Sequence, residues 1–292
     1  MRRLEKAIIL AFLAWLSLGS LADAAGTNRD ETKRVLAIIF GQEGLPFTVA
    51  LVQSLRSNLH SAAPHLVELN IEYADRFRYA DTVYLQKFTD LLRYKYSQPP
   101  MEVVLGLGDE AADLVAKYGE ALFGNVPMIA LTTNPDFQKD STVKPYLRNL
   151  VYGFDVLGQV ILIGKLLPEA RRLFIVSGSS QSDRGGARLV RENLRNYHGP
   201  LEVVYLSDMS KEALLAKVAR LPEHAVVLYT SFINDAEGKT FVSRDVMSEI
   251  AQAANAPVFG FFDIYLGYGI VGGYLLSPVD QGKRLADVAL QI

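Results

Sequence analysis

The sequence predicts an α/β protein of two lobes, each built on a parallel sheet, joined by a hinge. Short, almost wholly apolar runs alternate with amphipathic stretches of helical period, and the alternation recurs in a second series after residue 153. Continuous apolar runs are typical of parallel strands buried on both faces, and the amphipathic stretches between them are typical of crossover helices. Two series of similar size therefore predict two sheets.

The first series begins at Val35 to Phe40, an unbroken apolar run that ends at Gly41. After Pro46 an amphipathic stretch continues to about Ala62, as expected for a helix. Further strands are expected at 67–73, 102–107 and 127–132, with helices at 83–96 and 109–122. This order predicts a doubly wound parallel sheet.

The second series begins with a helix expected over 157–167. Strands follow at 172–176, 202–206, 225–229 and 257–261, with helices at 183–197, 211–221 and 244–255. The segment 149–154 is the expected first crossing between lobes, and 270–275 is the expected return. One lobe then comprises 34–152 plus about 270–292, and the other comprises 153–269. Two connecting strands predict hinged closure on a ligand.

The first 24 residues predict export. Basic residues within the first six positions precede an apolar run from Ala7 to Leu21, and small residues follow it. This is the layout of a secretory signal peptide cleaved after Ala24, although the same segment could be retained as a membrane anchor. The run is shorter than the ~20 residues that span a bilayer comfortably. We therefore expect a periplasmic or otherwise extracytoplasmic domain.

Composition argues against several classes of partner. The chain carries 30 Lys and Arg against 32 Asp and Glu, a net charge of −2, without the basic block that binds phosphates, so no nucleic acid is expected. It has no cysteine, which excludes disulfides, thiolate metal sites and a lipoprotein anchor. The four histidines are scattered along the chain, so no metal is expected.

Candidate ligand-binding residues follow the expected strands, because open parallel sheets bind ligands outside the carboxyl ends of their strands. Most are small, polar or aromatic. They are Glu43, Asp109, Thr132, Asn134, Ser179, Ser180, Asp183, Thr230, Phe232, Asp263 and Tyr265.

The run 177–183 precedes a helix and offers hydroxyls and backbone N–H groups at a positive helix end, which suits a carboxylate. We assign Ser179 and Ser180 to such an anion. Asp183 is of a type that equally caps helices, and the capping role is preferred for it. The hypothesis is a zwitterionic or carboxylate-bearing ligand with any amine near Asp263.

Glu43 is the second carboxylate placed to accept hydrogen bonds from an amine, with a solvated loop charge as the alternative for both. Phe232, Phe262 and Tyr265 follow late strands and would form a flat apolar wall, unless they belong to the core.

Enzymatic motifs are weak. Gly106-Leu107-Gly108 before Asp109 lacks the third glycine of a dinucleotide fingerprint, so no cofactor is expected. No Gly-x-Ser-x-Gly elbow occurs, and no histidine follows the carboxyl end of an expected strand. Catalysis by an Asp/Glu pair stays open but has no specific support, so no catalytic residue is assigned.

Several stretches in order resemble a known family. They are Glu72-Tyr73-Ala74-Asp75, Leu91 to Tyr96, Glu102 to Gly108, Leu122 to Pro127 and Tyr265 to Gly273. Together they resemble the uncharacterised ABC-transporter substrate-binding family, with its two Rossmann-like lobes of the type I periplasmic-binding-protein fold. They are most similar to the version that serves as extracytoplasmic sensor domain of bacterial histidine kinases. The resemblance covers nearly all of 34–292 and implies closure on a small organic solute without chemistry on it.

Two roles stay open. The expected helix over 278–292 stops without a cap, which favours a sensor domain whose parent chain continues into a membrane-embedded transmitter and carries a histidine kinase. The alternative is a soluble substrate-binding protein that delivers its ligand to an ABC permease. Whether the domain forms a homodimer is left open.

Overall fold

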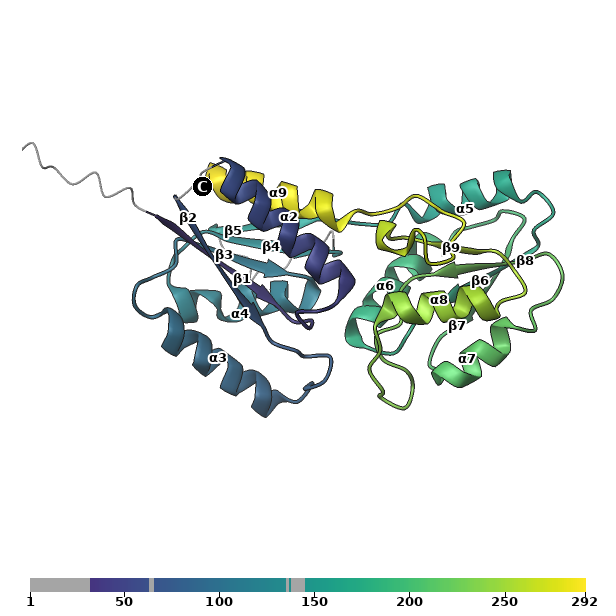
Figure 1. Cartoon of the computed structure of the whole chain (residues 1–292), viewed down its shortest axis with the longest axis horizontal. Helices are drawn as coiled ribbons and strands as arrows, with labels where there is room; N and C mark the ends of the chain where they lie inside the picture. Colours follow the sequence, from purple (N-terminus) through teal and green to yellow (C-terminus); the bar gives the residue numbers. More distant parts are fainter. Residues whose placement is uncertain (1–31, 63–65, 135–136, 138–144) are drawn as a thin grey trace, which may run out of the picture. The chain divides into compact units, whose positions relative to one another are not determined.

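Two parallel sheets organise the chain (Figure 1). The computed structural model describes residues 32–62, 66–134, 137 and 145–292, and the expected signal segment lies outside them. The first sheet has five strands in the order β2-β1-β3-β4-β5, and the second has four in the order β7-β6-β8-β9. All strand pairs within the two sheets are parallel. The predicted fold class is confirmed.

The five-stranded sheet follows the first series closely. Its strands are β1 (Lys33–Ile39), β2 (Val67–Tyr73), β3 (Val103–Leu107), β4 (Met128–Thr132) and β5 (Leu147–Val151), and its helices are α2 (Pro46–Ala62), α3 (Thr82–Tyr96) and α4 (Asp109–Phe123). Alternate side chains of each strand enter one of two hydrophobic clusters, one on each face of the sheet. The first expected crossing begins inside β5, because Asn149 pairs with Ala130 in the sheet.

The four-stranded sheet follows the second series. Its strands are β6 (Arg172–Val176), β7 (Glu202–Leu206), β8 (Ala225–Tyr229) and β9 (Val258–Gly260), and its helices are α5 (Val156–Leu166), α6 (Gln181–Asn193), α7 (Lys211–Val218) and α8 (Ser243–Ala253). It too has a hydrophobic cluster on each face. Helices on both faces bury the central strands, which explains their lack of polar alternation.

The chain passes between the sheets twice. The first passage follows Tyr152, whose N–H donates to the Thr132 carbonyl at 3.0 Å. On the return, Val271 N–H donates to the Val258 carbonyl at 2.7 Å and Leu276 N–H to the Phe261 carbonyl at 2.7 Å. The segment 271–276 therefore lies beside β9, and the second passage follows Leu276.

The last helix, α9 (Pro278–Gln291), packs along α2 (Figure 1). The Ser54 hydroxyl on α2 donates to the Val279 carbonyl at 2.6 Å. A side chain at Gly282 would place its Cβ 2.5 Å from the Leu51 carbonyl oxygen, so the two helices approach at van der Waals distance there. After the second passage the chain thus packs again on the five-stranded sheet, beside α2.

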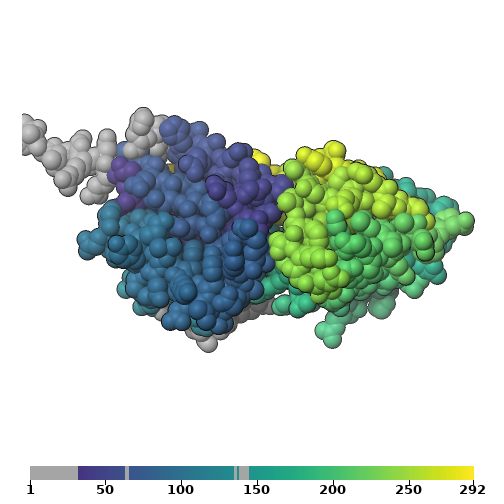
Figure 2. Space-filling view, turned by 60° about the horizontal axis from the view of Figure 1, so that its bottom comes forward, coloured from purple at the N-terminus to yellow at the C-terminus, as the bar shows by residue number. Residues whose placement is uncertain are grey.

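No helix in the described ranges is long and apolar enough to cross a bilayer. Single apolar side chains do reach the surface, as is normal for a folded domain. Val83, Leu91 and Tyr94 on α3 are exposed examples. Figure 2 shows the surface of the described residues coloured along the sequence.

Candidate functional site

A cavity of about 180 Å³ lies at the carboxyl ends of the strands. Ile39, Leu107, Leu131 and Tyr152 line it from the ends of β1, β3, β4 and β5, and Thr230 lines it from the end of β8. Open parallel sheets bind ligands at this edge. An apolar cavity of about 150 Å³ holds one benzene molecule, so the volume suits a ligand of amino-acid size.

Four phenylalanines form the apolar walls of this cavity: Phe47, Phe77, Phe154 and Phe262. Phe262 meets Phe47 edge-on at a ring-centroid separation of 5.4 Å and Phe154 edge-on at 5.3 Å. Edge-to-face contact at these separations is the favourable geometry for aromatic pairs. The walls therefore combine rings from α2 and from the segments that follow β2, β5 and β9.

Asp109 supplies the carboxylate of the cavity. It is the first residue of α4, where the positive end of the helix favours a negative charge. Its Oδ1 accepts from the Thr132 hydroxyl at 2.5 Å and the Thr133 N–H at 2.7 Å, and its Oδ2 accepts from the Thr133 hydroxyl at 2.6 Å. A carboxylate offers about four acceptor positions, so a position remains for a ligand donor.

The negative charge of Asp109 acts on its neighbours. Burial raises the pKa of the Tyr152 hydroxyl, and the Asp109 charge raises it further. Tyr152 therefore stays protonated at neutral pH and can donate a hydrogen bond within the cavity.

Arg244 supplies the cation, and it is the single Lys or Arg among the described lining residues. Its guanidinium carbon lies 4.4 Å from the centroid of the Tyr268 ring, which is cation–π geometry. Its Nε lies 3.7 Å from Asp245 Oδ1 and, among the described residues, has no hydrogen-bond partner. The planar guanidinium is suited to bidentate binding of a carboxylate.

Ser243 fixes the start of α8 and so positions Arg244. The Tyr229 hydroxyl donates to the Ser243 carbonyl at 2.8 Å, and the Phe232 N–H donates to the Ser243 hydroxyl at 3.0 Å. The Tyr265 hydroxyl lies 3.1 Å from the same Ser243 oxygen. Buried aromatic residues thus hold the backbone that carries the cation.

Four of the residues expected from the sequence line the cavity: Asp109, Thr230, Phe262 and Tyr265. Thr132 is fully buried behind them and reaches the site through its bond to Asp109. Phe232 lies in the core under α8, which was the alternative weighed for it.

The other expected residues lie outside the lining. Glu43 is exposed beside it, and the Asn134 N–H donates to the Thr132 hydroxyl at 3.0 Å. Asp263 begins a 3-10 turn at 263–265, and Ser179 donates to Asp208 at 3.4 Å. The structure therefore does not bring Asp263 together with Ser179 in this cavity.

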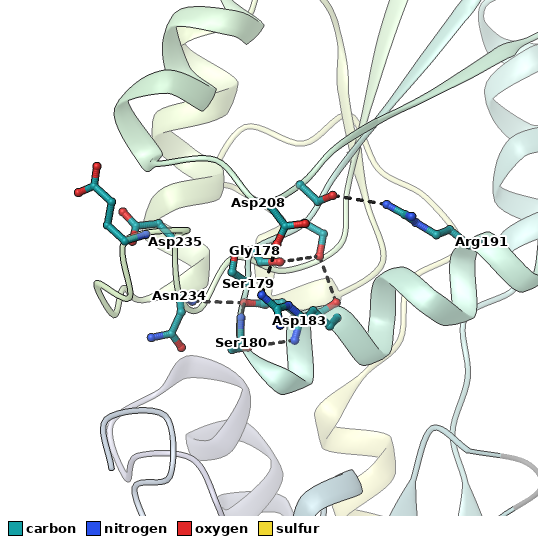
Figure 3. A network of polar contacts seen from close by, with 12 residues as sticks. Gly178, Ser179, Ser180, Asp183, Arg191, Asp208, Asn234 and Asp235 are labelled. Carbon is teal, nitrogen blue, oxygen red and sulfur yellow. Dashed lines mark hydrogen bonds and ion pairs between the residues drawn. The ribbon is translucent and has the colours of Figure 1, made fainter. Parts of the chain in front are cut away.

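Ser180 and Asp183 form a capping box at the start of α6 (Figure 3). The Ser180 hydroxyl accepts from the Asp183 N–H at 3.0 Å, and Asp183 Oδ2 accepts from the Ser180 N–H at 3.0 Å. The same Oδ2 accepts from the N–H groups of Ile233 and Asn234 at 2.9 and 3.2 Å, and Oδ1 accepts from the Ser231 hydroxyl at 2.5 Å. The capping role preferred for Asp183 is confirmed, and it extends to Ser180.

Gly178 makes this network possible. A Cβ at this position would lie 2.4 Å from Asp183 Oδ2 and 2.6 Å from the Asn234 carbonyl oxygen. The loop after β6 can therefore close over the buried carboxylate only with glycine there.

Sequence reasoning missed Arg244 and three of the four phenylalanines. Arg244 stands well beyond β8, after a loop, so strand ends do not point to it. Its position directly after the first residue of a helix was a usable signal. Phe47 and Phe77 stand in stretches that read as helix and loop, where aromatic residues usually belong to the core.

Glu110, next to Asp109, gives a pH-dependent prediction. Burial raises its pKa above the ordinary 4.5, Arg76 lowers it, and Asp109 and Asp113 raise it. Below pH 4.5 both folded and unfolded chains hold this proton, and as pH rises above 4.5 the folded state pays for ionising a buried group. We expect Glu110→Gln to raise the melting temperature at pH 7 and to leave it unchanged at pH 4, as measured by differential scanning calorimetry. An equal shift at both pH values would contradict the assignment.

No group of three or more His, Asp or Glu residues in the described ranges could hold a metal ion.

Comparison with known proteins gives similarity in fold and none in sequence family. No protein-family model matches the chain, and no curated protein is similar to it in sequence.

Solved structures of the periplasmic-binding-protein fold are similar to this one. An ABC domain from Streptococcus pneumonia in complex with L-Trp has a TM-score of 0.64 at 14% identity, covering 89% of this chain and 84% of that one. A conserved domain protein from Vibrio cholerae gives 0.62 at 16%, with the same two coverages of 89% and 84%. An ABC transporter solute binding protein from Bacillus halodurans with bound myo-inositol gives 0.55 at 14%, covering 91% and 90%. These likenesses establish the type I periplasmic-binding-protein fold for this chain.

Proposed function

We propose that this chain is an extracytoplasmic receptor for a small zwitterionic or carboxylate-bearing molecule of amino-acid size. One observation carries the proposal: a cavity with aromatic walls and two charged lining side chains of opposite sign, Asp109 and Arg244, among the described residues. A zwitterion matches that pair, because each charge meets its opposite and neither protein charge is left unpaired.

The orientation of the ligand follows from the same residues. The Arg244 guanidinium receives the carboxylate, and Asp109 accepts from the amine. The apolar group lies among the phenylalanines, where its burial contributes about 25 cal/mol per Å². Arg244 and Asp109 replace Ser179-Ser180 and Asp263 in these roles, because they line the cavity and the others do not.

Closure of two lobes is the proposed binding mode. One lobe comprises 34–152 with the last helix, and the other comprises the four-stranded sheet with its helices. Phe47 on α2 and Phe262 after β9 are in contact at the cavity wall, so a ligand that packs against both rings would favour the closed arrangement. The solved relatives in fold support this proposal, since they bind small molecules: one holds L-Trp and another holds myo-inositol.

A ligand screen tests the function. The probes are L-tryptophan, L-phenylalanine, L-leucine, benzoate and, as an uncharged comparison, myo-inositol. We expect one or more carboxylates to raise the melting temperature by several degrees, because a ligand at 100 times its Kd adds about 2.7 kcal/mol to the free energy of unfolding. Calorimetric titration then gives the Kd. A flat response to every probe at millimolar concentration would count against the proposal, as would turnover of a probe.

The biological role is proposed as sensing, in a signalling protein such as a histidine kinase. The chain has no lipoprotein cysteine, so a transport version would have to be freely soluble, and in a sensor residues 1–24 would act as export signal or anchor. The alternative is a soluble binding protein of an ABC transporter. Deleting the gene separates the two: loss of labelled-ligand uptake indicates transport, whereas intact uptake with a lost transcriptional response indicates sensing.

A further inference from the structure

Within the lobe of the four-stranded sheet, the side chain of Gln159 joins the helix that follows the first passage to the segment that precedes the second. Gln159 lies on α5, the helix that follows the first passage, and its N–H donates to the Asp155 carbonyl at 2.9 Å. Its side-chain Oε1 accepts from the Tyr274 N–H at 2.6 Å, just before the second passage. A backbone N–H can only donate, so the oxygen and not the amide nitrogen of Gln159 faces Tyr274.

The environment of Gln159 leaves little freedom. The side chain is fully buried. A Cβ at Gly273 would lie 2.6 Å from its Oε1 and 2.5 Å from the Gly260 carbonyl oxygen. Gly273 also has a φ of 155°, which side chains other than glycine rarely adopt. The return segment 271–276 therefore packs closely against both β9 and Gln159.

The other half of the Gln159 amide is unsatisfied. Its Nε2 is buried and has no hydrogen-bond partner in the described part of the chain. Buried side-chain donors are satisfied in the large majority of cases, and an exception calls for an explanation. A methionine or leucine would fill this position without an orphan donor, so packing alone does not account for glutamine here.

We propose that Gln159 is a hinge-positioning residue: by anchoring the return segment to α5 it fixes the points at which both passages leave this lobe, and through them the resting separation of the two sheets. The anchor is a single side-chain hydrogen bond, because Nε2 has no partner in the described part of the chain, so its loss would let the return segment shift. This inference rests on the proposed function, because it assumes that the lobes move. Gln159 does not line the cavity and acts only through Tyr274.

The test measures the separation of the sheets directly. The chain has no cysteine, so spin labels can be placed at Lys87→Cys on α3 and Lys217→Cys on α7 without removing a native thiol. Pulsed electron–electron resonance then gives the distance distribution of the ligand-free protein. We expect Gln159→Met to change the ratio of the resting to the shifted population by about two- to tenfold, the range expected for one hydrogen bond.

Two variants serve as comparisons. Gln159→Glu keeps an acceptor for Tyr274 and is expected to retain the wild-type distribution. Gln252→Met makes the same chemical change at an exposed site on α8 and should have no effect. A wild-type distribution for Gln159→Met overturns the proposal. Failure of that variant to fold overturns it too, since the residue would then be structural. Because no ligand is present, a flat ligand screen contradicts the proposed function and not the role of Gln159.

Discussion

Replacing Arg244 by alanine should weaken binding of carboxylate ligands by roughly 10- to 150-fold, because a hydrogen bond to a charged group contributes about 1.5–3 kcal/mol. Arg244→Lys keeps the charge but loses the planar fork, so we expect an intermediate loss. Calorimetric titration of the strongest ligand from the screen measures both. The folding free energy should change little, because the guanidinium is partly exposed and its contacts are to Tyr268 and Asp245.

Two controls isolate the carboxylate contact. Arg220→Ala, at an exposed position after α7, should leave the Kd unchanged. If L-tryptophan is a ligand, L-tryptophanol keeps its ring and amine but lacks the carboxylate. It should bind wild type and Arg244→Ala with the same Kd, because without a carboxylate it makes no contact that the loss of the guanidinium could remove. A Kd for the carboxylate within twofold of wild type in Arg244→Ala would show that the anion lies elsewhere.

Asp183→Ala should destabilise the protein by about 3–5 kcal/mol, the cost of removing one partner from a buried charged network. The substitution leaves four donors without their acceptor: the N–H groups of Ser180, Ile233 and Asn234 and the hydroxyl of Ser231. The melting temperature should fall by on the order of 10 °C, as measured by calorimetry at pH 7. Ser231 lines the cavity, so ligand affinity should fall as well.

The matched variants of this prediction are Asp183→Asn and Asp90→Ala. Asparagine keeps one oxygen for the three N–H donors and presents its amide to the Ser231 hydroxyl, which can accept. It also removes an ionisation that burial disfavours, since burial raises the pKa of Asp183 while the hydrogen bonds lower it. We expect it to cost clearly less than alanine. Asp90 is exposed on α3, and its removal should change stability by less than about 0.5 kcal/mol. Equal losses for alanine and asparagine would contradict the network's role.

The order of strands and helices was accessible from sequence because each central strand is buried on both faces. Runs such as Val35 to Phe40 need no alternation and are bounded by glycine or polar residues, so their limits are visible. β5 was harder to recognise. It reads Leu147–Val151 with an arginine and an asparagine inside, because it is the edge strand and is only partly covered.

The site was accessible only where it follows strand ends. Asp109, Thr230, Phe262 and Tyr265 were found by that rule, and they do line the cavity. Arg244 was not, since its position depends on the contacts of Ser243 with Tyr229 and Tyr265, which are far from it in sequence. Nor does a sequence tell whether a serine such as Ser180 faces a ligand or its own helix, because the same residue types serve both purposes.

The packing of α9 along α2 has a mechanical consequence. The Lys33 ammonium, at the start of β1, donates to the Ala289 carbonyl at 3.1 Å, so residues near the two ends of the described fold touch. A pulling force applied at these two points would enter and leave through the same layer, and the load would bypass the passages at Tyr152 and Leu276. On the proposed hinged closure, the four-stranded sheet would then still move, while the five-stranded sheet with α2 and α9 is held at these two points.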